Sequence, residues 1–202
     1  MGCAHTRLQT EKAMTDNELK WTIDSKKELL RTPVYDVIEQ HEISASGIEG
    51  DYIAIDCPDW VQVIPEYGDS FVMVRQWRHS SEALTTEFPG GVVDRGEDPA
   101  VSAARELLEE TGFRAGRLTK LGDCSPNPAL FKNRFHVYLA EDLTPTGEQD
   151  LDDDELLTYR LIPIREVIAS FGKGGFTHAL TGTAIAYYLQ NRNYKHKDFP
   201  KE

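Results

Sequence analysis

Residues 91–113, GVVDRGEDPAVSAARELLEETGF, carry the pattern that most constrains this chain. Asp98 suits a helix N-cap, Pro99 suits the first helical position, and Gly112 suits a left-handed stop. These signals predict a helix over residues 99–111, about 20 Å long at roughly 1.5 Å per residue.

Three glutamates share one side of this predicted helix. At roughly 100° per residue, Glu106, Glu109 and Glu110 fall within an arc of about 100°. The apolar residues fill an arc centred nearly opposite: Ala100, Val101, Ala104, Leu107 and Leu108. The sequence therefore predicts one face that is buried and another that presents three carboxylates.

These three glutamates, called the glutamate group below, can form a metal site or a solvated acidic face. Like charges four residues apart, as at Glu106 and Glu110, destabilise a helix slightly. Converging oxygen ligands are what a divalent cation such as Mg²⁺ prefers. Gly90-Gly91 lets a backbone carbonyl approach an ion closely, and Arg105 can hold Glu109 through a bidentate pair. These neighbours favour the metal site.

The spacing of these residues resembles the complete signature of the Nudix hydrolases. It reads Gly91, Glu97, Arg105-Glu106-Leu107, Glu109-Glu110 and Gly112-Phe113. The resemblance implies an α/β fold, with a mixed sheet sandwiched between helices and an extra N-terminal antiparallel sheet. It also implies hydrolysis of a nucleoside diphosphate linked to another moiety. The implied metal site holds two or more Mg²⁺ ions, with Mn²⁺ as the alternative, on the Gly90 carbonyl, Glu106, Glu109 and Glu110. Arg105 orients the carboxylates and, with Glu109, is expected to be catalytic.

Segments outside the signature resemble the ADP-ribose pyrophosphatases of that family. By this resemblance Arg78, Glu87 and Pro128 belong to the substrate site, and Trp21 stacks on the nucleobase near a dimer interface. The implied substrate is ADP-ribose or a related nucleotide sugar, and the implied assembly is a homodimer. The residue types alone leave Arg78 open to a surface salt bridge and Trp21 to a core or interface position.

An acidic run over residues 148–155 precedes an apolar strand. Glu155, two residues before Leu157, matches the position of a loop glutamate that is catalytic in the family, and Asp153 is the nearest rival. Acidic runs are usually solvated loops. Loops can also carry catalytic groups that close on substrate, so we expect Glu155 to assist the reaction.

Composition restricts the partners and the compartment. The net charge of −12 and pI near 4.9 argue against a nucleic-acid partner held through phosphates. No apolar run approaches 18 residues, so no membrane span is expected. Three cysteines without a CxxC motif favour a reducing, cytoplasmic location, and the six histidines show no zinc spacing.

The chain is expected to divide into four parts. These are a disordered leader (1–18), an N-terminal β region for dimerisation and substrate (19–66), a Nudix core (67–191) and a polar tail (192–202). Within them, β-branched and aromatic runs predict strands at 21–24, 34–41, 52–57, 60–65, 70–77, 118–124, 134–139 and 156–162. Helices are expected at 165–171 and 176–190, besides 99–111.

Three alternatives remain at this level. The substrate can be another sugar nucleotide, such as a GDP- or UDP-sugar. The chain can be a non-catalytic module that binds ADP-ribose, although binding alone does not need three like charges. The acidic helix can also be purely structural.

Overall fold

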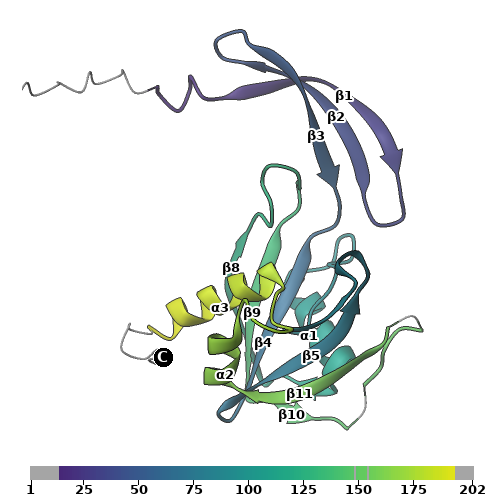
Figure 1. The fold of residues 1–202 in the computed structure, drawn as a ribbon, viewed down its shortest axis with the longest axis vertical. Coiled ribbons are helices and arrows are strands. Elements are labelled where there is room, and N and C mark those ends of the chain that lie inside the picture. The colour runs from purple at the N-terminus through teal and green to yellow at the C-terminus, as the bar shows by residue number, and fades with distance from the viewer. Residues whose placement is uncertain (1–13, 148, 154, 194–202) are drawn as a thin grey trace, which may run out of the picture. The chain divides into compact units, whose positions relative to one another are not determined.

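The structure of the protein is a computed structural model, which describes residues 14–147, 149–153 and 155–193 (Figure 1). It divides into an N-terminal unit that ends at Asp56 and a C-terminal unit that begins at Cys57. Each unit is described by itself.

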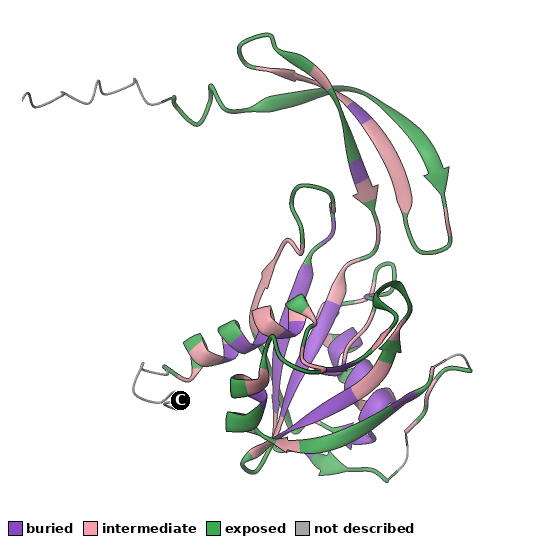
Figure 2. Ribbon diagram, in the orientation of Figure 1, coloured by how far each residue is buried: buried purple, intermediate pink, exposed green. Residues whose placement is uncertain are grey.

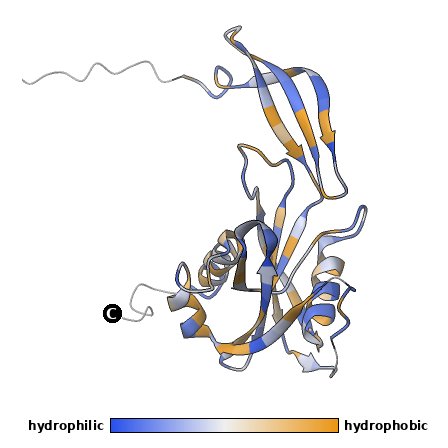
Figure 3. Ribbon diagram, turned by 45° about the vertical axis from the view of Figure 1, so that its right-hand side comes forward, coloured by the Kyte–Doolittle hydropathy of each residue, from blue (hydrophilic) through white to orange (hydrophobic). Residues whose placement is uncertain are grey.

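The N-terminal unit is a three-stranded antiparallel sheet in the order β1-β2-β3. Its strands are β1 (Trp21–Arg31), β2 (Asp36–Ser44) and β3 (Glu49–Asp56). Every residue of β1 is exposed (Figure 2). Apolar positions nevertheless recur along the strands (Figure 3), including Ile23, Leu30 and Ile53. The predicted extra sheet is therefore present. Strand β1 continues beyond its predicted end at residue 24, and β3 begins before its predicted start at residue 52.

The C-terminal unit holds the remaining strands and three helices. The strands are β4 (Trp60–Tyr67), β5 (Ser70–Arg78), β6 (Ala83–Glu87), β7 (Phe113–Arg114), β8 (Arg117–Cys124), β9 (Phe135–Glu141), β10 (Thr144–Pro145) and β11 (Leu157–Pro163). The helices are α1 (Pro99–Thr111), α2 (Ile164–Ser170) and α3 (Ala179–Asn191), with a short 3₁₀ turn at His79–Ser81. The α/β prediction is confirmed, but β6 was not predicted.

The main sheet runs β11-β5-β4-β9-β8, with β6 paired to β5. The pair β4–β9 is parallel and the others are antiparallel. Strands β4 and β5 form the predicted hairpin, but they pair only near their turn, and β5 then pairs with β6. The chain after β6 returns to β4, where Val63 N donates to Pro89 O and Val61 N donates to Gly91 O, each at 2.9 Å. Residues 89–91, called the glycine segment below, therefore lie directly against β4.

Gly90 is required by this close approach. A β-carbon at Gly90 would lie 2.1 Å from the carbonyl oxygen of Val61, which is too close for any side chain. Replacing this glycine would push the segment away from β4 and displace the start of α1.

Helices cover both faces of the main sheet (Figure 1). On one face α1 packs on a cluster that includes Val61, Val72 and Leu107. On the other face α2 and α3 pack on a cluster built around Phe71, Phe88 and Tyr188. The ring of Phe71 lies 5.2 Å from that of Phe88 and 4.9 Å from that of Tyr188, which are edge-to-face distances. Helix α1, which carries the signature residues, therefore packs on buried apolar side chains of the sheet.

Helix α1 has the predicted bounds, but its buried side differs from the prediction. Asp98 accepts a hydrogen bond from Ala100 N, and Gly112 adopts the left-handed conformation at φ 67°. Val101 is 56% exposed, whereas Glu106 and Glu110 are only 8% and 2% exposed. The carboxylates are buried because the glycine segment covers this side of the helix, which periodicity within the helix cannot show.

The observed boundary between the units falls earlier than the predicted one at 66/67. Strand β4 belongs to the core sheet, because it pairs with β9 along its length. In the predicted leader, residues 1–13 lie outside the described residues, while Thr15 N donates to Glu18 Oε2 at 2.7 Å in a turn. In the predicted tail, Arg192 bonds Glu66 in the core, and residues 194–202 lie outside the described part.

Candidate active site

Arg105 is the centre of an ion-pair network on α1. Its Nη1 donates to Glu106 Oε1 at 2.9 Å and to Glu109 Oε2 at 3.1 Å. Its Nη2 donates to Glu97 Oε2 at 3.2 Å and to the carbonyl oxygen of Val92 at 3.3 Å. The expected bidentate pair with Glu109 is therefore absent, because Glu97 takes the second side of the guanidinium. Arg105 links the glutamates to the segment that precedes the helix.

Glu106 and Glu110 are the buried members of the glutamate group. Glu110 Oε2 accepts a hydrogen bond from Gly90 N at 2.8 Å. A β-carbon at Gly91 would lie 2.6 Å from Glu106 Oε1, so this carboxylate rests directly against the glycine backbone. Both glycines of the segment therefore serve the carboxylates, one through a bond and one through lack of a side chain.

Burial strongly affects the protonation of these two groups. Burial, more than any charge, raises the pKa of Glu106 to about 7, although Arg105 opposes the shift. Burial likewise raises the pKa of Glu110 well above 4.5, and the neighbouring Glu106 and Glu155 carboxylates add to the effect. The protein therefore holds two carboxylates whose charged forms lack sufficient compensation from the chain itself.

Glu155 lies close enough to this pair to act on it electrostatically. Its carboxylate raises the pKa of both Glu106 and Glu110. The loop that carries it is attached to the end of α1, since Asp150 N donates to Glu109 O at 2.9 Å and Gln149 also bonds the helix. The structure thus brings Glu155 to the glutamate group.

Arg78 and Glu87 form a second, adjoining group. Arg78 donates from Nε to Glu87 Oε1 at 2.9 Å and from Nη2 to Oε2 at 2.6 Å. Glu87 is 0% exposed, so its carboxylate depends on neighbouring side chains, and not on water, for its hydrogen bonds. Burial alone would raise the pKa of Glu87, but Arg78 and His178 outweigh it and hold this pKa well below its ordinary value. Arg78 therefore lies beside the glutamates with one side of its guanidinium fixed.

Pro128 and Trp21 are not brought into these groups by any described contact. Pro128 is exposed in the loop between β8 and β9, where Phe131 packs on Trp60 at a ring distance of 5.6 Å. Trp21 belongs to the N-terminal unit, is 39% exposed, and lies 5.5 Å from the Tyr52 ring. Their roles remain predictions.

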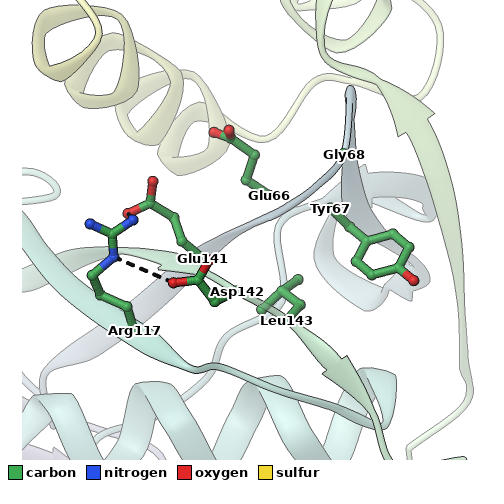
Figure 4. Close-up of a pocket in the computed structure, with 7 residues that line it drawn as sticks. All are labelled: Glu66, Tyr67, Gly68, Arg117, Glu141, Asp142 and Leu143. Atoms are coloured by element: carbon green, nitrogen blue, oxygen red, sulfur yellow. Dashed lines mark ion pairs between the residues drawn. The ribbon is translucent and has the colours of Figure 1, made fainter.

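A separate cavity of about 320 Å³ lies at the turn between β4 and β5 (Figure 4). Its charged groups already have partners: Arg117 Nη2 lies 3.2 Å from Glu141 Oε2, and Arg192 Nη2 lies 2.8 Å from Glu66 Oε2. These paired charges leave little attraction for a charged ligand, so the glutamate group is the better candidate site.

The glutamate group fits a divalent cation by its chemistry. In the part of the chain that the structure describes, no three His, Cys, Asp or Glu side chains are gathered into a ready ligand set. Glu106 and Glu110 are nevertheless hard oxygen donors with raised pKa values, and a bound cation would stabilise their charged forms. Gly90, Glu106, Glu109 and Glu110 are the groups that would hold it.

Comparison with known proteins identifies the family. The NUDIX domain model matches residues 60–180, which include β4 to the start of α3 and the whole glutamate group. The chain belongs to the Nudix family. This confirms the resemblance drawn from the signature and places the signature helix within a complete domain.

Two curated relatives and one solved structure illustrate the Nudix neighbourhood. An ADP-ribose pyrophosphatase of Bacillus subtilis (strain 168) is 34% identical over 117 residues, or 57% of this chain. The match spans 63% of that relative, which is less than two thirds of its length. A methanol dehydrogenase activator of Bacillus methanolicus is 30% identical over 130 residues, covering 64% of this chain and 70% of the relative.

The solved structure resembles this chain in fold. It is a crystal structure of an ADP compounds hydrolase, with a TM-score of 0.77 and 24% identity. The match covers 90% of this chain and 98% of the solved chain, so the likeness of fold includes residues of both units. In the described part, no helix is both long and apolar enough to cross a membrane.

Sequence reasoning missed two contributors to the site. Glu97 was noted only as a signature residue, yet it accepts from Arg105, and this partner holds the pKa of Glu97 below its ordinary value. The fixed interval between Glu97 and Arg105 was the available signal. His178, whose Nδ1 lies 2.9 Å from Glu87 Oε2, carried no spacing signal, because it is far from Glu87 along the chain.

Replacing Glu110 by Gln is expected to stabilise the metal-free protein. The folded pKa of Glu110 exceeds the ordinary 4.5, so metal-free stability falls as pH rises above 4.5. Gln removes this charge and keeps an oxygen for Gly90 N. At pH 7.5 with a chelator, the melting temperature should rise by about 2–4 °C, a shift that corresponds to roughly 1 kcal/mol for a chain of this length. The rise should shrink at pH 5.

The matched control is Glu166→Gln, an exposed charge on α2. It should not raise the melting temperature at either pH, because an exposed carboxylate in the first turn of a helix slightly stabilises that helix. A metal-free Glu110→Gln protein that melts below the wild type at pH 7.5 would contradict the electrostatic account of the buried pair.

Proposed function

We propose that the protein hydrolyses the pyrophosphate bond of ADP-ribose or a related nucleoside diphosphate sugar, using Mg²⁺. The products are a nucleoside monophosphate and a sugar phosphate. The observation that carries this proposal is the buried pair Glu106 and Glu110, held against Gly90-Gly91 with raised pKa values. The name of the Bacillus subtilis relative, ADP-ribose pyrophosphatase, supports the same substrate class.

The glutamate group provides the charge that this reaction needs. Glu106, Glu109, Glu110 and the Gly90 carbonyl would hold two or more Mg²⁺ ions, with Mn²⁺ as an alternative. Bound divalent cations neutralise phosphate oxygens and lower the pKa of a water molecule. Arg105 keeps Glu106 and Glu109 in place through its shared Nη1. An acidic protein of net charge −12 thereby accepts a doubly anionic diphosphate without a large basic surface.

The residues around the glutamates suit the remaining tasks. Glu155 approaches the buried pair closely enough to raise its pKa values, so it can accept a proton from the attacking water. Arg78, fixed by Glu87, presents a cation beside Glu110, which lowers the pKa of that residue through its charge. We assign Arg78 to the diphosphate and retain Pro128 as a substrate contact.

Two alternatives are kept. Another sugar nucleotide, such as a GDP- or UDP-sugar, would use the same glutamates with different base contacts. A non-catalytic ADP-ribose-binding module is disfavoured, because burying Glu106 and Glu110 together gives no benefit to binding an anion. The cytoplasmic location expected from the cysteines remains a prediction.

The decisive experiment is turnover on a panel of nucleotide sugars. Glu106→Gln is expected to lower turnover by several orders of magnitude with the fold intact, since metal-assisted charge stabilisation supplies several kcal/mol. Phosphate release in the presence of Mg²⁺ and a phosphatase measures the rate. Glu166→Gln should retain the wild-type rate. Near-normal rates for both Glu106→Gln and Glu110→Gln would exclude the glutamate group as the metal site.

The loop carboxylates can be separated by a second pair of variants. Glu155→Gln should lower kcat by about 10²–10⁴-fold with little change in KM, the usual contribution of general-base catalysis. Asp153→Asn should have a much smaller effect. The reverse order would assign the role to Asp153, and two silent substitutions would remove the loop from the mechanism.

We also propose that the N-terminal sheet forms a homodimer and contributes Trp21 to the nucleobase site. The exposed apolar residues of β1 and β3 support an interface. Trp21→Ala should raise KM more than it lowers kcat, since stacking contributes to uniform binding. Tyr35→Ala, at the other end of β1–β2, is the matched control and should preserve KM. A monomer by light scattering at micromolar concentration would exclude the dimer, and loss of stability without a kinetic change would exclude stacking.

A further inference from the structure

The buried carboxylate of Glu87 has two contacts on each oxygen. Oε1 accepts from Arg78 Nε at 2.9 Å and from the Thr85 hydroxyl. Oε2 accepts from Arg78 Nη2 at 2.6 Å and lies 2.9 Å from His178 Nδ1. The last contact has the distance of an ion pair but not the angle of a well-aligned hydrogen bond. Arg78 thus holds one edge of the carboxylate, while Thr85 and His178 flank it.

His178 is delivered to Glu87 by the segment that leads into α3. Thr86 N donates to Gly175 O at 2.8 Å, which attaches this segment to β6. On the far side of His178, Gln62 Nε2 donates to Thr181 Oγ1 at 3.3 Å, which attaches the first turn of α3 to β4. His178 is therefore anchored on both sides, and its side chain is only 30% exposed.

This arrangement determines what Arg78 can offer to a ligand. Nε and Nη2 are used by Glu87, whereas Nη1 makes no hydrogen bond within the part of the chain that the structure describes. A guanidinium presents its donors in a rigid plane, so fixing one edge fixes the direction of the other donors. Any group that fixes the Glu87 plane therefore also fixes where Arg78 points.

We propose that His178 is a positioning residue for substrate: it orients Glu87 and, through it, the free donors of Arg78 toward the substrate diphosphate. This inference rests on the proposed function, because it assigns Arg78 to that ligand. It adds the start of α3, a region without any signature residue, to the determinants of substrate affinity.

A double-mutant cycle tests this inference. His178→Ala should raise KM for ADP-ribose roughly 3- to 10-fold with little change in kcat, as expected for a contact that acts through its neighbour. His178→Asn, which restores a donor, should recover part of the loss. Arg78→Lys keeps the charge but removes the bidentate fork, so adding His178→Ala to it should raise KM little further.

Tyr188→Phe is the matched control, placed on α3, the helix that His178 directly precedes. It removes a hydrogen bond of 2.9 Å to the Glu66 carboxylate at the border of the cavity in Figure 4. It should leave KM unchanged even if it lowers the melting temperature. Three outcomes would each overturn the positioning role. His178→Ala could raise KM equally in the wild type and in Arg78→Lys, or His178→Asn could recover none of the loss. Tyr188→Phe could also raise KM as much as His178→Ala does.

A binding measurement separates this inference from the proposed hydrolysis. Titration calorimetry with ADP-ribose in a chelator, performed on the same four proteins of the cycle, reports affinity without turnover, because the proposed hydrolysis requires Mg²⁺. If the wild type binds ADP-ribose but hydrolyses none of the panel, the proposed reaction fails while the cycle still tests His178. If the wild type hydrolyses ADP-ribose and the His178 variants match it in both KM and affinity, only the positioning role fails.

Discussion

The structure depends on placing two carboxylates, Glu106 and Glu110, where water cannot fully solvate them. Burial raises both pKa values, and Glu155 adds a third negative charge nearby. Arg105 compensates only part of this charge, because it also bonds Glu97 and Val92. Such an arrangement lowers the stability of the metal-free fold near neutral pH, and a bound cation would supply the missing charge.

The glycine segment is what makes this burial possible. Pro89 and Gly91 bond β4, and Gly90 passes within a distance of Val61 that no β-carbon permits. The same segment begins where β6 ends, at Glu87, so the glutamate group and the Arg78–Glu87 pair share one piece of backbone. A displacement of this segment would therefore disturb both groups together. The residues that flank this segment pack on opposite faces of the sheet (Figure 1). Phe88 belongs to the cluster under α2 and α3, and Val93 belongs to the cluster under α1.

Features set by neighbouring residues could be predicted from the sequence. The bounds of α1 follow from Asp98, Pro99 and Gly112, which act within one helical turn. The burial of Glu106 and the exposure of Val101 could not be predicted, because they depend on a segment that folds back from β6. Strand β6 escaped detection because Ala83–Glu87 forms a strand through its partner β5 rather than through its own composition. The contact between Glu87 and His178 joins residues far apart along the chain, so no periodic pattern in the sequence predicts it.

The attachment of the Glu155 loop to α1 limits how far this residue can travel. Asp150 is bonded to the end of the helix that carries the other glutamates, and Leu157 is already paired with Gln76 in the sheet. Few residues lie between these anchors, so few backbone torsions remain to be fixed when substrate binds. Ordering a residue costs about 1–2 kcal/mol of conformational entropy, which would otherwise be subtracted from affinity. For the proposed role of Glu155, a short, doubly anchored loop thus leaves little conformational entropy to be lost on binding.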